Sequence, residues 1–460
     1  MARDFTTGKP MKTIFLFAIP MLIGNIFQQL YSTVDTIIVG NFEGAPAIAA
    51  VSASASLQFL LVSIAFGFTG GMSVVISQVY GARDYEKMKR VFATGFIFVI
   101  LLAFVLAIVG QFISEPVMRL LGTDESILPN SVKYLKIMFA GMPFSFVYNM
   151  YASVLRAIGD SKTPLYFLIV SALTNIVLDL VFVATFGMGV AGVAWATLIA
   201  QGFSGLLCHI YVGKKVQIFK LSKDEWKMEK ELLKPIINYG LPASIQQSVT
   251  SLGMLFVQSQ VNFFGPGMTA AYGVSNRIQN FATMPQMQLA MALSMFAGQN
   301  IGAGEEARAK EGIRATMTMQ IIYAVAMGFI LPVAAPTLIG WFGLAEDIAV
   351  LNLATMGLSF MARMVWMFGI FQALNQFHRG VGDTKFSMVA SLCMVMVRVP
   401  ATYLMVHVIQ LGEISIWAGM VTGWFVACSA NAIRFLSGGW RGKAYVQGRV
   451  DKKKEVEAEA

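Results

Sequence analysis

Apolar residues lie along this chain in long runs, and polar residues separate these runs mainly as short connecting segments. Each run is long enough to cross a bilayer as a helix, which needs about 20 mostly apolar residues. The runs lie at 14–40, 47–77, 91–114, 132–156, 164–186, 190–213, 235–263, 269–297, 313–340, 348–377, 385–409 and 413–437. Strands of a membrane barrel would be shorter and would alternate strictly between apolar and polar residues. The pattern therefore predicts an all-α integral membrane protein with twelve transmembrane helices.

Three short motifs occur twice, in the same order and at nearly constant separation. Ile19-Pro20 returns as Leu241-Pro242, Gln78–Ala82 as Gln299–Ala303, and Arg156–Lys162 as Arg379–Lys385, at separations of 222, 221 and 223 residues. Recurrence at one period indicates an internal duplication. Six spans per half is an even number, so both halves have the same orientation. We therefore expect two six-helix bundles related by a pseudo-twofold axis along the membrane normal.

The duplication also predicts the domain boundaries. We expect an N-terminal six-helix lobe, a cytoplasmic linker, a C-terminal six-helix lobe and a cytoplasmic tail of basic and acidic residues, at 1–213, 214–234, 235–437 and 438–460. Two bundles around a central cavity are typical of transporters that work by alternating access.

Composition and charge support a membrane location. Charged residues make up 13% of the chain and hydrophobic residues 56%, whereas a soluble domain carries about 25% charged residues. The net charge is +9, but Lys and Arg concentrate on one side of the predicted topology, and the opposite side holds only Arg119, Lys133 and Lys136. This bias predicts a multi-pass protein of the cell (inner) membrane with both termini cytoplasmic. The excess of basic residues is therefore explained by the membrane topology, and we expect no nucleic-acid partner.

Cysteine and histidine are too dispersed for a catalytic or metal-binding cluster. The cysteines lie within predicted spans without a pairing pattern, and the histidines lie at span ends: Cys208, Cys393, Cys428, His209, His378 and His407. We therefore expect neither an enzyme nor a bound cofactor.

Two acids, Asp35 and Asp179, lie well inside predicted spans, while the others fall in loops, tails or span ends. A charged side chain at the bilayer centre costs about 2.5–3.5 kcal/mol on insertion scales, so intramembrane acids are functional candidates. Counted from the outer span ends, Thr197 lies at about the depth of the two acids. Asn175 is one helical turn from Asp179 on the same face, and Asn149 lies at about the depth of Asn175. Two carboxylates with amides and a hydroxyl suit a hard cation or a shared proton. The alternative for the three neutral residues is hydrogen bonding between helices.

A polar stripe in the first span and a methionine run in the eighth indicate a substrate cavity. The stripe must face a partner helix or a wet cavity, and flexible thioethers suit surfaces that accept many shapes. The candidate cavity residues are Gln29, Ser32, Gln247, Met284, Met287 and Met291. The alternative for the methionines is ordinary packing.

The second half lacks the acidic site. Val257 stands at the position equivalent to Asp35. The other intramembrane charges are Arg277, Arg363 and Arg398, which fit interior ion pairs and anion contacts equally well.

At this level of detail the chain resembles the multidrug and toxic compound extrusion (MATE) transporters over nearly its whole length. The resemblance rests on the segments Gln28–Gly40, Arg156–Asp160 and Asn175–Asp179. It implies export of amphipathic organic cations, such as dyes or fluoroquinolones, in exchange for protons or sodium ions. We expect the protein to act as a monomer. The cation site of such proteins matches Asp35, Asn149, Asn175, Asp179 and Thr197, and a sodium ion would bind Asp35, Asn175 and Asp179.

Other classes of membrane protein fit less well. A flippase for a lipid-linked precursor needs several cationic groups facing a pyrophosphate, and the three interior arginines are spread over three spans. A channel pore normally repeats its acidic ring with its symmetry, and here the acids occur in one half only.

Overall fold

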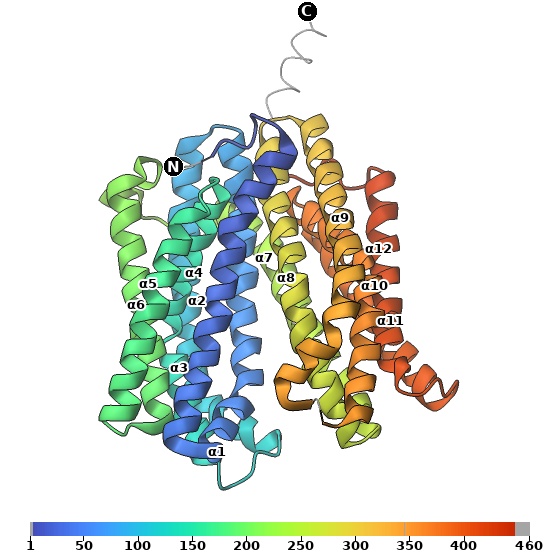
Figure 1. The fold of residues 1–460 in the computed structure, drawn as a ribbon. Helices are drawn as coiled ribbons and strands as arrows, with labels where there is room; N and C mark the ends of the chain where they lie inside the picture. The colour runs from blue at the N-terminus through green and yellow to red at the C-terminus, as the bar shows by residue number, and fades with distance from the viewer. Residues whose placement is uncertain (1–2, 345, 447–460) are drawn as a thin grey trace, which may run out of the picture. The chain divides into compact units, whose positions relative to one another are not determined.

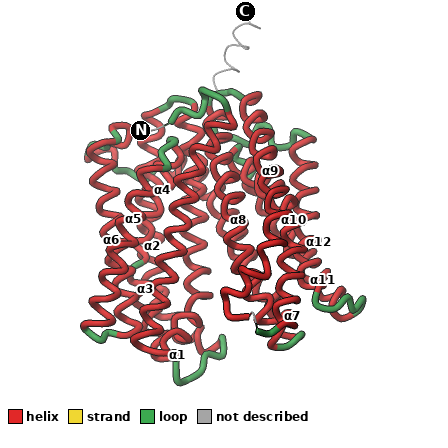
Figure 2. Tube along the Cα trace, viewed as in Figure 1, coloured by secondary structure: helices red, strands yellow, loops and turns green. Residues whose placement is uncertain are grey.

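The computed structural model describes residues 3–344 and 346–446. Within these residues the chain is helical throughout, with short loops and no strand (Figures 1 and 2). The helices are α1 (Pro10–Gly81), α2 (Tyr85–Leu120), α3 (Leu128–Ala140), α4 (Met142–Ala157), α5 (Lys162–Asp179), α6 (Gly189–Lys215), α7 (Lys230–Phe263), α8 (Pro266–Gly302), α9 (Glu306–Ile339), α10 (Ile348–Gly380), α11 (Thr384–His407) and α12 (Ile414–Leu436). Short π-helical segments η1 (Leu180–Thr185) and η4 (Gly340–Leu344) follow α5 and α9.

The predicted all-α fold is confirmed, with one difference in how spans map onto helices. The first two predicted spans both lie within α1 and are separated at Gly44, whose φ of 77° is non-helical. The fourth predicted span is broken into α3 and α4 at Gly141, directly before Met142-Pro143, because proline removes a helical hydrogen bond. Eight of the described helices are long and apolar enough to cross a membrane by length and composition. Many large apolar side chains are exposed, for example Phe112, Phe329 and Val333, as expected of surfaces that face lipid.

The described helices pack as two compact units. The first comprises Ile19–Ser244 with the N-terminal residues through Asp4, and the second comprises Phe5–Ala18 with the chain from Ile245 onward. The division by packing thus falls inside α1 and α7, whereas the sequence predicts functional lobes that meet at the linker, and those boundaries stay a prediction. Of the predicted tail, 447–460 lies outside the described residues.

Small residues explain why the start of α7 packs with the first unit. Gly67 and Gly71 on α1 face Ser244 and Gly240 on α7 so closely that a Cβ on Gly71 would lie 2.4 Å from the Gly240 nitrogen. Such pairs of small residues one turn apart let helix backbones approach within a membrane. Ser244 also donates a hydrogen bond of 3.2 Å to the Ile64 carbonyl.

The N-terminal segment packs with the second unit through Phe5, which is buried. Its backbone N–H donates to Gln299 Oε1 (3.1 Å), and its carbonyl accepts from Asn300 Nδ2 (3.2 Å) and Arg308 Nε (3.1 Å). Gln299 and Asn300 belong to one of the repeated motifs, so this copy of the motif anchors the chain terminus.

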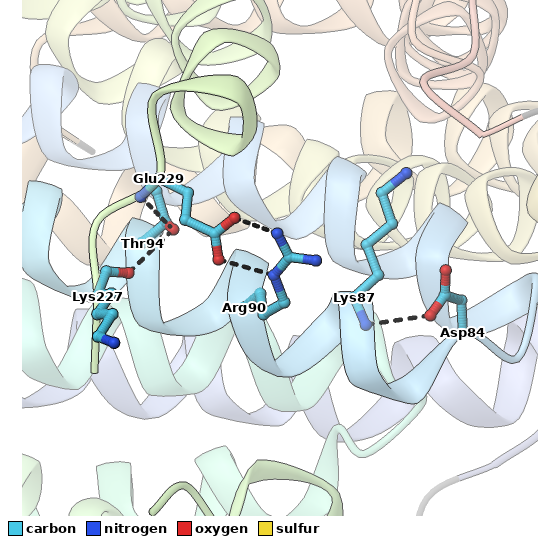
Figure 3. Close-up of polar contacts among 6 residues, drawn as sticks. All are labelled: Asp84, Lys87, Arg90, Thr94, Lys227 and Glu229. Atoms are coloured by element: carbon cyan, nitrogen blue, oxygen red, sulfur yellow. Dashed lines mark hydrogen bonds and ion pairs between the residues drawn. The ribbon is translucent and has the colours of Figure 1, made fainter. Parts of the chain in front are cut away.

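The predicted linker is attached to α2 within the first unit (Figure 3). Arg90 donates two hydrogen bonds to the Glu229 carboxylate, one of them of 2.7 Å from Nε. The Glu229 N–H donates to Thr94 Oγ1 (3.2 Å), whose hydroxyl donates to the Lys227 carbonyl (3.4 Å). The ring of Phe219 packs 4.8 Å from that of Phe92 on α2. The linker is therefore a packed part of the first unit.

Candidate functional site

Polar residues recur at intervals of four on three helices of the first unit, and these helices contact one another. Residues four apart lie on one face of a helix. The three series are Ser145 and Asn149 on α4, Ser171, Asn175 and Asp179 on α5, and Thr197 and Gln201 on α6. Asn175 Nδ2 donates to Thr197 Oγ1 over 3.4 Å, and the Ser145 hydroxyl hydrogen-bonds the Gln201 amide oxygen. The three polar faces therefore meet inside the unit.

Asp35 on α1 and Asp179 at the end of α5 interact with each other. Asp179 is fully buried. Among residues 3–344 and 346–446, no hydrogen-bond donor reaches Asp35 Oδ1, either carboxylate oxygen of Asp179, or Asn175 Oδ1. Buried polar atoms are normally paired, so four oxygens without a donor mark a place that a cation or protons can satisfy.

The phenol groups of Tyr31 and Tyr134 lie within electrostatic reach of both acids. No salt bridge of the described residues involves Asp35 or Asp179. Two carboxylates side by side without a basic partner repel each other when both are ionised. The pair therefore needs a proton or a bound cation, because no basic side chain of residues 3–344 and 346–446 supplies that charge through a salt bridge.

Two small cavities adjoin this region. One, of about 40 Å³, is lined by Gln28, Tyr31, Tyr148, Asn149, Leu168, Ser171, Ala172, Asn175, Thr197, Ala200 and Gln201. The other, of about 50 Å³, shares Asn149 and Gln201 with it. Drug-sized ligands need pockets of about 300–1,000 Å³, so each cavity has the size for water or a small ion and is too small for an organic substrate.

The helix that carries Asp179 changes its geometry directly after this residue. The α-helix α5 ends at Asp179 and continues as the π-helical segment η1. A π-helical turn is rare and occurs frequently at functional sites, because the wider turn redirects side chains and frees backbone groups. This irregularity lies next to one of the two membrane-embedded acids.

The structure brings the predicted cation-site residues together in two groups. Asn149, Asn175 and Thr197 line one cavity, and Asp35 and Asp179 form the adjacent acidic pair. Three further residues line the same cavity but were not predicted from the sequence: Tyr31, Ser171 and Gln201. Each lies four residues from a predicted member, namely Asp35, Asn175 and Thr197, so helical periodicity carried the signal that identifies them.

Comparison with known proteins gives the family. The MatE family model matches residues 20–181 and 242–404, which is the greater part of the chain. The chain belongs to the MatE family. The two matched ranges begin 222 residues apart, so the model also recognises the internal duplication, and the predicted membership of the MATE transporters is confirmed.

Relatives of this MatE protein are named as drug-resistance and export proteins. It is 35% identical over 416 residues to the probable multidrug resistance protein YoeA of Bacillus subtilis, covering 89% of each chain. It is 27% identical to the multidrug export protein MepA of Staphylococcus saprophyticus, over 94% of this chain and 95% of the relative. A solved MOP superfamily transporter from Pyrococcus furiosus superposes with a TM-score of 0.88 at 24% identity, covering 95% of this chain and 98% of that one. The chain is thus a multi-pass membrane protein of a multidrug efflux transporter family.

The predicted substrate-cavity residues of this MatE protein are distributed over both units. Gln29 and Ser32 are exposed on α1 in the first unit. In the second unit Gln247 and Met287 are exposed, Met291 is half-buried and Met284 is buried. Met284 therefore has the environment of a packing residue, and the cavity role of the whole set stays a prediction.

The three interior arginines of the MatE fold differ in environment. Arg277 and Arg363 are exposed, whereas Arg398 is buried. None of the three forms a salt bridge within the described parts of the chain. Two roles were predicted for these arginines, interior ion pairs and anion contacts. The described residues give no support to interior ion pairs.

Proposed function

We propose that this MatE protein is a secondary antiporter, rather than an enzyme, that exports amphipathic organic cations in exchange for protons or sodium ions. The observation that carries the proposal is the pair of half-buried Asp35 and fully buried Asp179. Asp35 Oδ1 and both carboxylate oxygens of Asp179 have no hydrogen-bond donor among the described residues. The names of its relatives, which refer to multidrug resistance and export, support the substrate class.

The coupling ion binds the acidic pair with help from the neighbouring neutral ligands. Carboxylate, amide and hydroxyl oxygens are the ligands that hard cations prefer, and Asn175, Thr197 and Asn149 supply them next to the acids. An ion drives a conformational change only if it binds one state more tightly than the other. Protonation or sodium binding removes the repulsion between the two carboxylates, which favours the state in which they lie together. Release of the ion favours the other state and completes the alternating-access cycle.

The coupling ion is identified by transport in reconstituted vesicles. Export of a fluorescent organic cation is measured with a proton gradient alone, then with a sodium gradient alone, each against a vesicle with no gradient. Export under either gradient supports antiport. If neither gradient drives uphill export while vesicles with a lipid-linked precursor show translocation, the flippase becomes the better function.

Substrate binding rests on apolar contact with few directional bonds. We therefore expect Met287→Ala and Met291→Ala to shift the preference among dyes without abolishing export of all of them. Complete loss for every substrate would give these residues a structural or coupling role instead.

The same proposal places both termini in the cytoplasm and the protein in the cell membrane as a monomer. Cysteines introduced at Glu43 and Asp124 should react with an impermeant thiol reagent from outside the cell. Reaction only from the cytoplasmic side would invert the topology.

A further inference from the structure

The second unit contains a buried charge that the proposed coupling site does not use. Arg398 lies within α11 with a side chain only 4% exposed. Its Nε and Nη2 have no hydrogen-bond partner among the described residues. A guanidinium is not deprotonated in proteins, so this site holds a permanent positive charge.

The surroundings of Arg398 are apolar and aromatic. A Cβ on Gly423 of α12 would lie 3.0 Å from Arg398 Cβ, so α11 and α12 are in close contact here. The phenol of Tyr272 on α8 is within electrostatic reach of the guanidinium, and Met394, Trp417 and Trp424 pack in the same core cluster as Tyr272. A charge in such a place is strongly unfavourable unless a partner of opposite sign joins it.

The described acids of the second unit do not supply that partner. They lie in loops or in the first two turns of helices: Glu305, Glu306, Glu311, Glu346, Asp347, Asp383 and Glu413. The salt bridges within this unit join Glu306 and Asp383 to other basic residues. None of the described acids of the unit therefore completes the Arg398 site, and an anion from outside the chain can do so.

The duplication shows that Arg398 occupies the counterpart of the coupling site. The separation of 223 residues that relates Arg156 to Arg379 also relates Asn175 to Arg398 and Asp179 to Thr402. Asp35 corresponds to Val257, which is fully buried in the core cluster around Tyr272. At this place in the fold the first unit has two acids, and the second unit has one base and no acid.

We propose that Arg398 binds a carboxylate group of transported compounds, so that the second unit recognises the anionic end of zwitterionic amphiphiles. The two unpartnered nitrogens, Nε and Nη2, form one edge of the guanidinium, and this edge donates two parallel hydrogen bonds to a carboxylate. A single arginine fits one carboxylate better than a pyrophosphate, which requires several cations. The neighbouring Tyr272 hydroxyl offers a further donor. The inference rests on the proposed export function and adds a second substrate feature to it.

The test uses two forms of one fluorescent probe. A rhodamine dye with a free carboxylate is compared with its ethyl ester, which keeps the cationic ring system but has no anionic group. Binding to the full chain in nanodiscs of uncharged-headgroup or zwitterionic lipid is followed by fluorescence anisotropy. Hydrogen bonds to charged groups contribute about 1.5–3 kcal/mol, so Arg398→Gln should weaken binding of the free-acid dye at least about ten-fold. The ester should bind the variant within about two-fold of wild type, because its contacts are unchanged.

Two further variants keep the result interpretable. Arg363→Gln removes an exposed arginine of α10 and should leave the affinities for both dyes unchanged. Arg398→Lys keeps the charge but loses the two-nitrogen edge, so it should bind the free-acid dye between wild type and Arg398→Gln. A thermal unfolding curve without dye checks that each variant is folded.

Equal weakening of both dyes, or no change for either, in a folded Arg398→Gln protein would overturn the carboxylate site. Failure of antiport is separable from this result. If Asp179→Asn still exports the ester against its gradient, the proposed coupling site is wrong while the dye-binding difference at Arg398 stands.

Discussion

The two copies of the duplicated helix pair, α1 with α5 and α7 with α11, have opposite chemistry at equivalent positions. In the first unit, Asp35 and Asp179 face each other with unpaired oxygens. In the second, Val257 is part of an apolar core and Thr402 donates its hydroxyl to the Arg398 carbonyl of its own helix. The same backbone duplication therefore carries an acidic site in one unit and a basic site in the other. Duplication preserved the scaffold, and the charged residues diverged on it.

The local motifs that the duplication preserved have backbone roles. Gly159 and Gly382 have φ of 88° and 91°, a region that favours glycine. The next residue in each copy is an acid: Asp160 Oδ1 accepts from the Thr163 N–H (3.0 Å), and Asp383 Oδ2 accepts from Arg434 (2.8 Å). In both copies the glycine and the acid lie in the loop directly before a helix, α5 in the first unit and α11 in the second. Their similarity thus reflects the shared backbone fold, whereas the two copies differ at the positions of Asp35 and Asn175.

The largest expected effect is on transport. Asp35→Asn and Asp179→Asn each remove one ionisable carboxyl from the pair but preserve its shape, so the ion can no longer relieve a repulsion. Gradient-driven export should fall to the level of passive leak in both variants, with normal insertion and folding. Asp124→Asn, in the loop between α2 and α3, is the matched control and should export at the wild-type rate. Wild-type uphill export by either membrane variant would make the pair structural.

The difference between the two units is also tested by Val257→Asp, which places an acid in the second unit at the counterpart of Asp35. Val257 is fully buried, and an Asp at the helix centre costs about 2.5–3.5 kcal/mol on insertion scales. The variant should lose about that much stability in denaturant unfolding in detergent. Val257→Asn separates charge from polarity and should lose less. Wild-type stability of Val257→Asp would mean that the two positions have equivalent environments.

A smaller effect is expected at the neutral ligands. Asn175→Ala and Thr197→Val each remove one partner of the 3.4 Å hydrogen bond and one oxygen near the acids. Loss of one neutral contact of about 1.4 kcal/mol corresponds to about ten-fold weaker ion binding. Ion-dependent protection against thermal unfolding measures this change. Thr402→Val in the second unit is the matched control, and an equal loss there would remove the distinction between the two units.

The hydrophobic pattern predicted the helices well because it follows directly from what a bilayer requires. It separated the first two spans at the position where the non-helical Gly44 divides α1, but it missed the break between α3 and α4 at Gly141. Asp35, Asn175 and Asp179 were identifiable because polar residues within apolar runs are few. Tyr31 was less evident because an aromatic ring is also an ordinary packing residue. The environment of Arg398 required the structure, since exposed Arg277 and Arg363 look the same in sequence.

The smallest expected effect concerns the linker and the N-terminal segment, where the two units also differ. In the first unit the linker is attached to α2 by Arg90 and Glu229. In the second unit the N-terminal segment is attached to α8 by the buried Phe5, whose N–H donates to Gln299. Hydrogen bonds from Arg90 lower the pKa of the Glu229 carboxyl from its usual value. Stability from this pair is therefore fully present above the unfolded-state pKa of Glu229 and is lost as pH falls through the lower folded-state pKa.

Both partners are substantially exposed, so solvent screens the pair and its contribution should be at most about 0.5 kcal/mol. A double-mutant cycle of Arg90→Gln and Glu229→Gln, followed by denaturant unfolding, isolates this coupling energy. The coupling should be measurable at pH 7, should decrease in salt, and should vanish in acid once Glu229 is protonated. Phe5→Ala in the second unit removes apolar contact instead of charge, so its effect on stability should not depend on salt. If the Arg90–Glu229 coupling persists in acid, the pair is joined by a hydrogen bond that does not require the charge of Glu229.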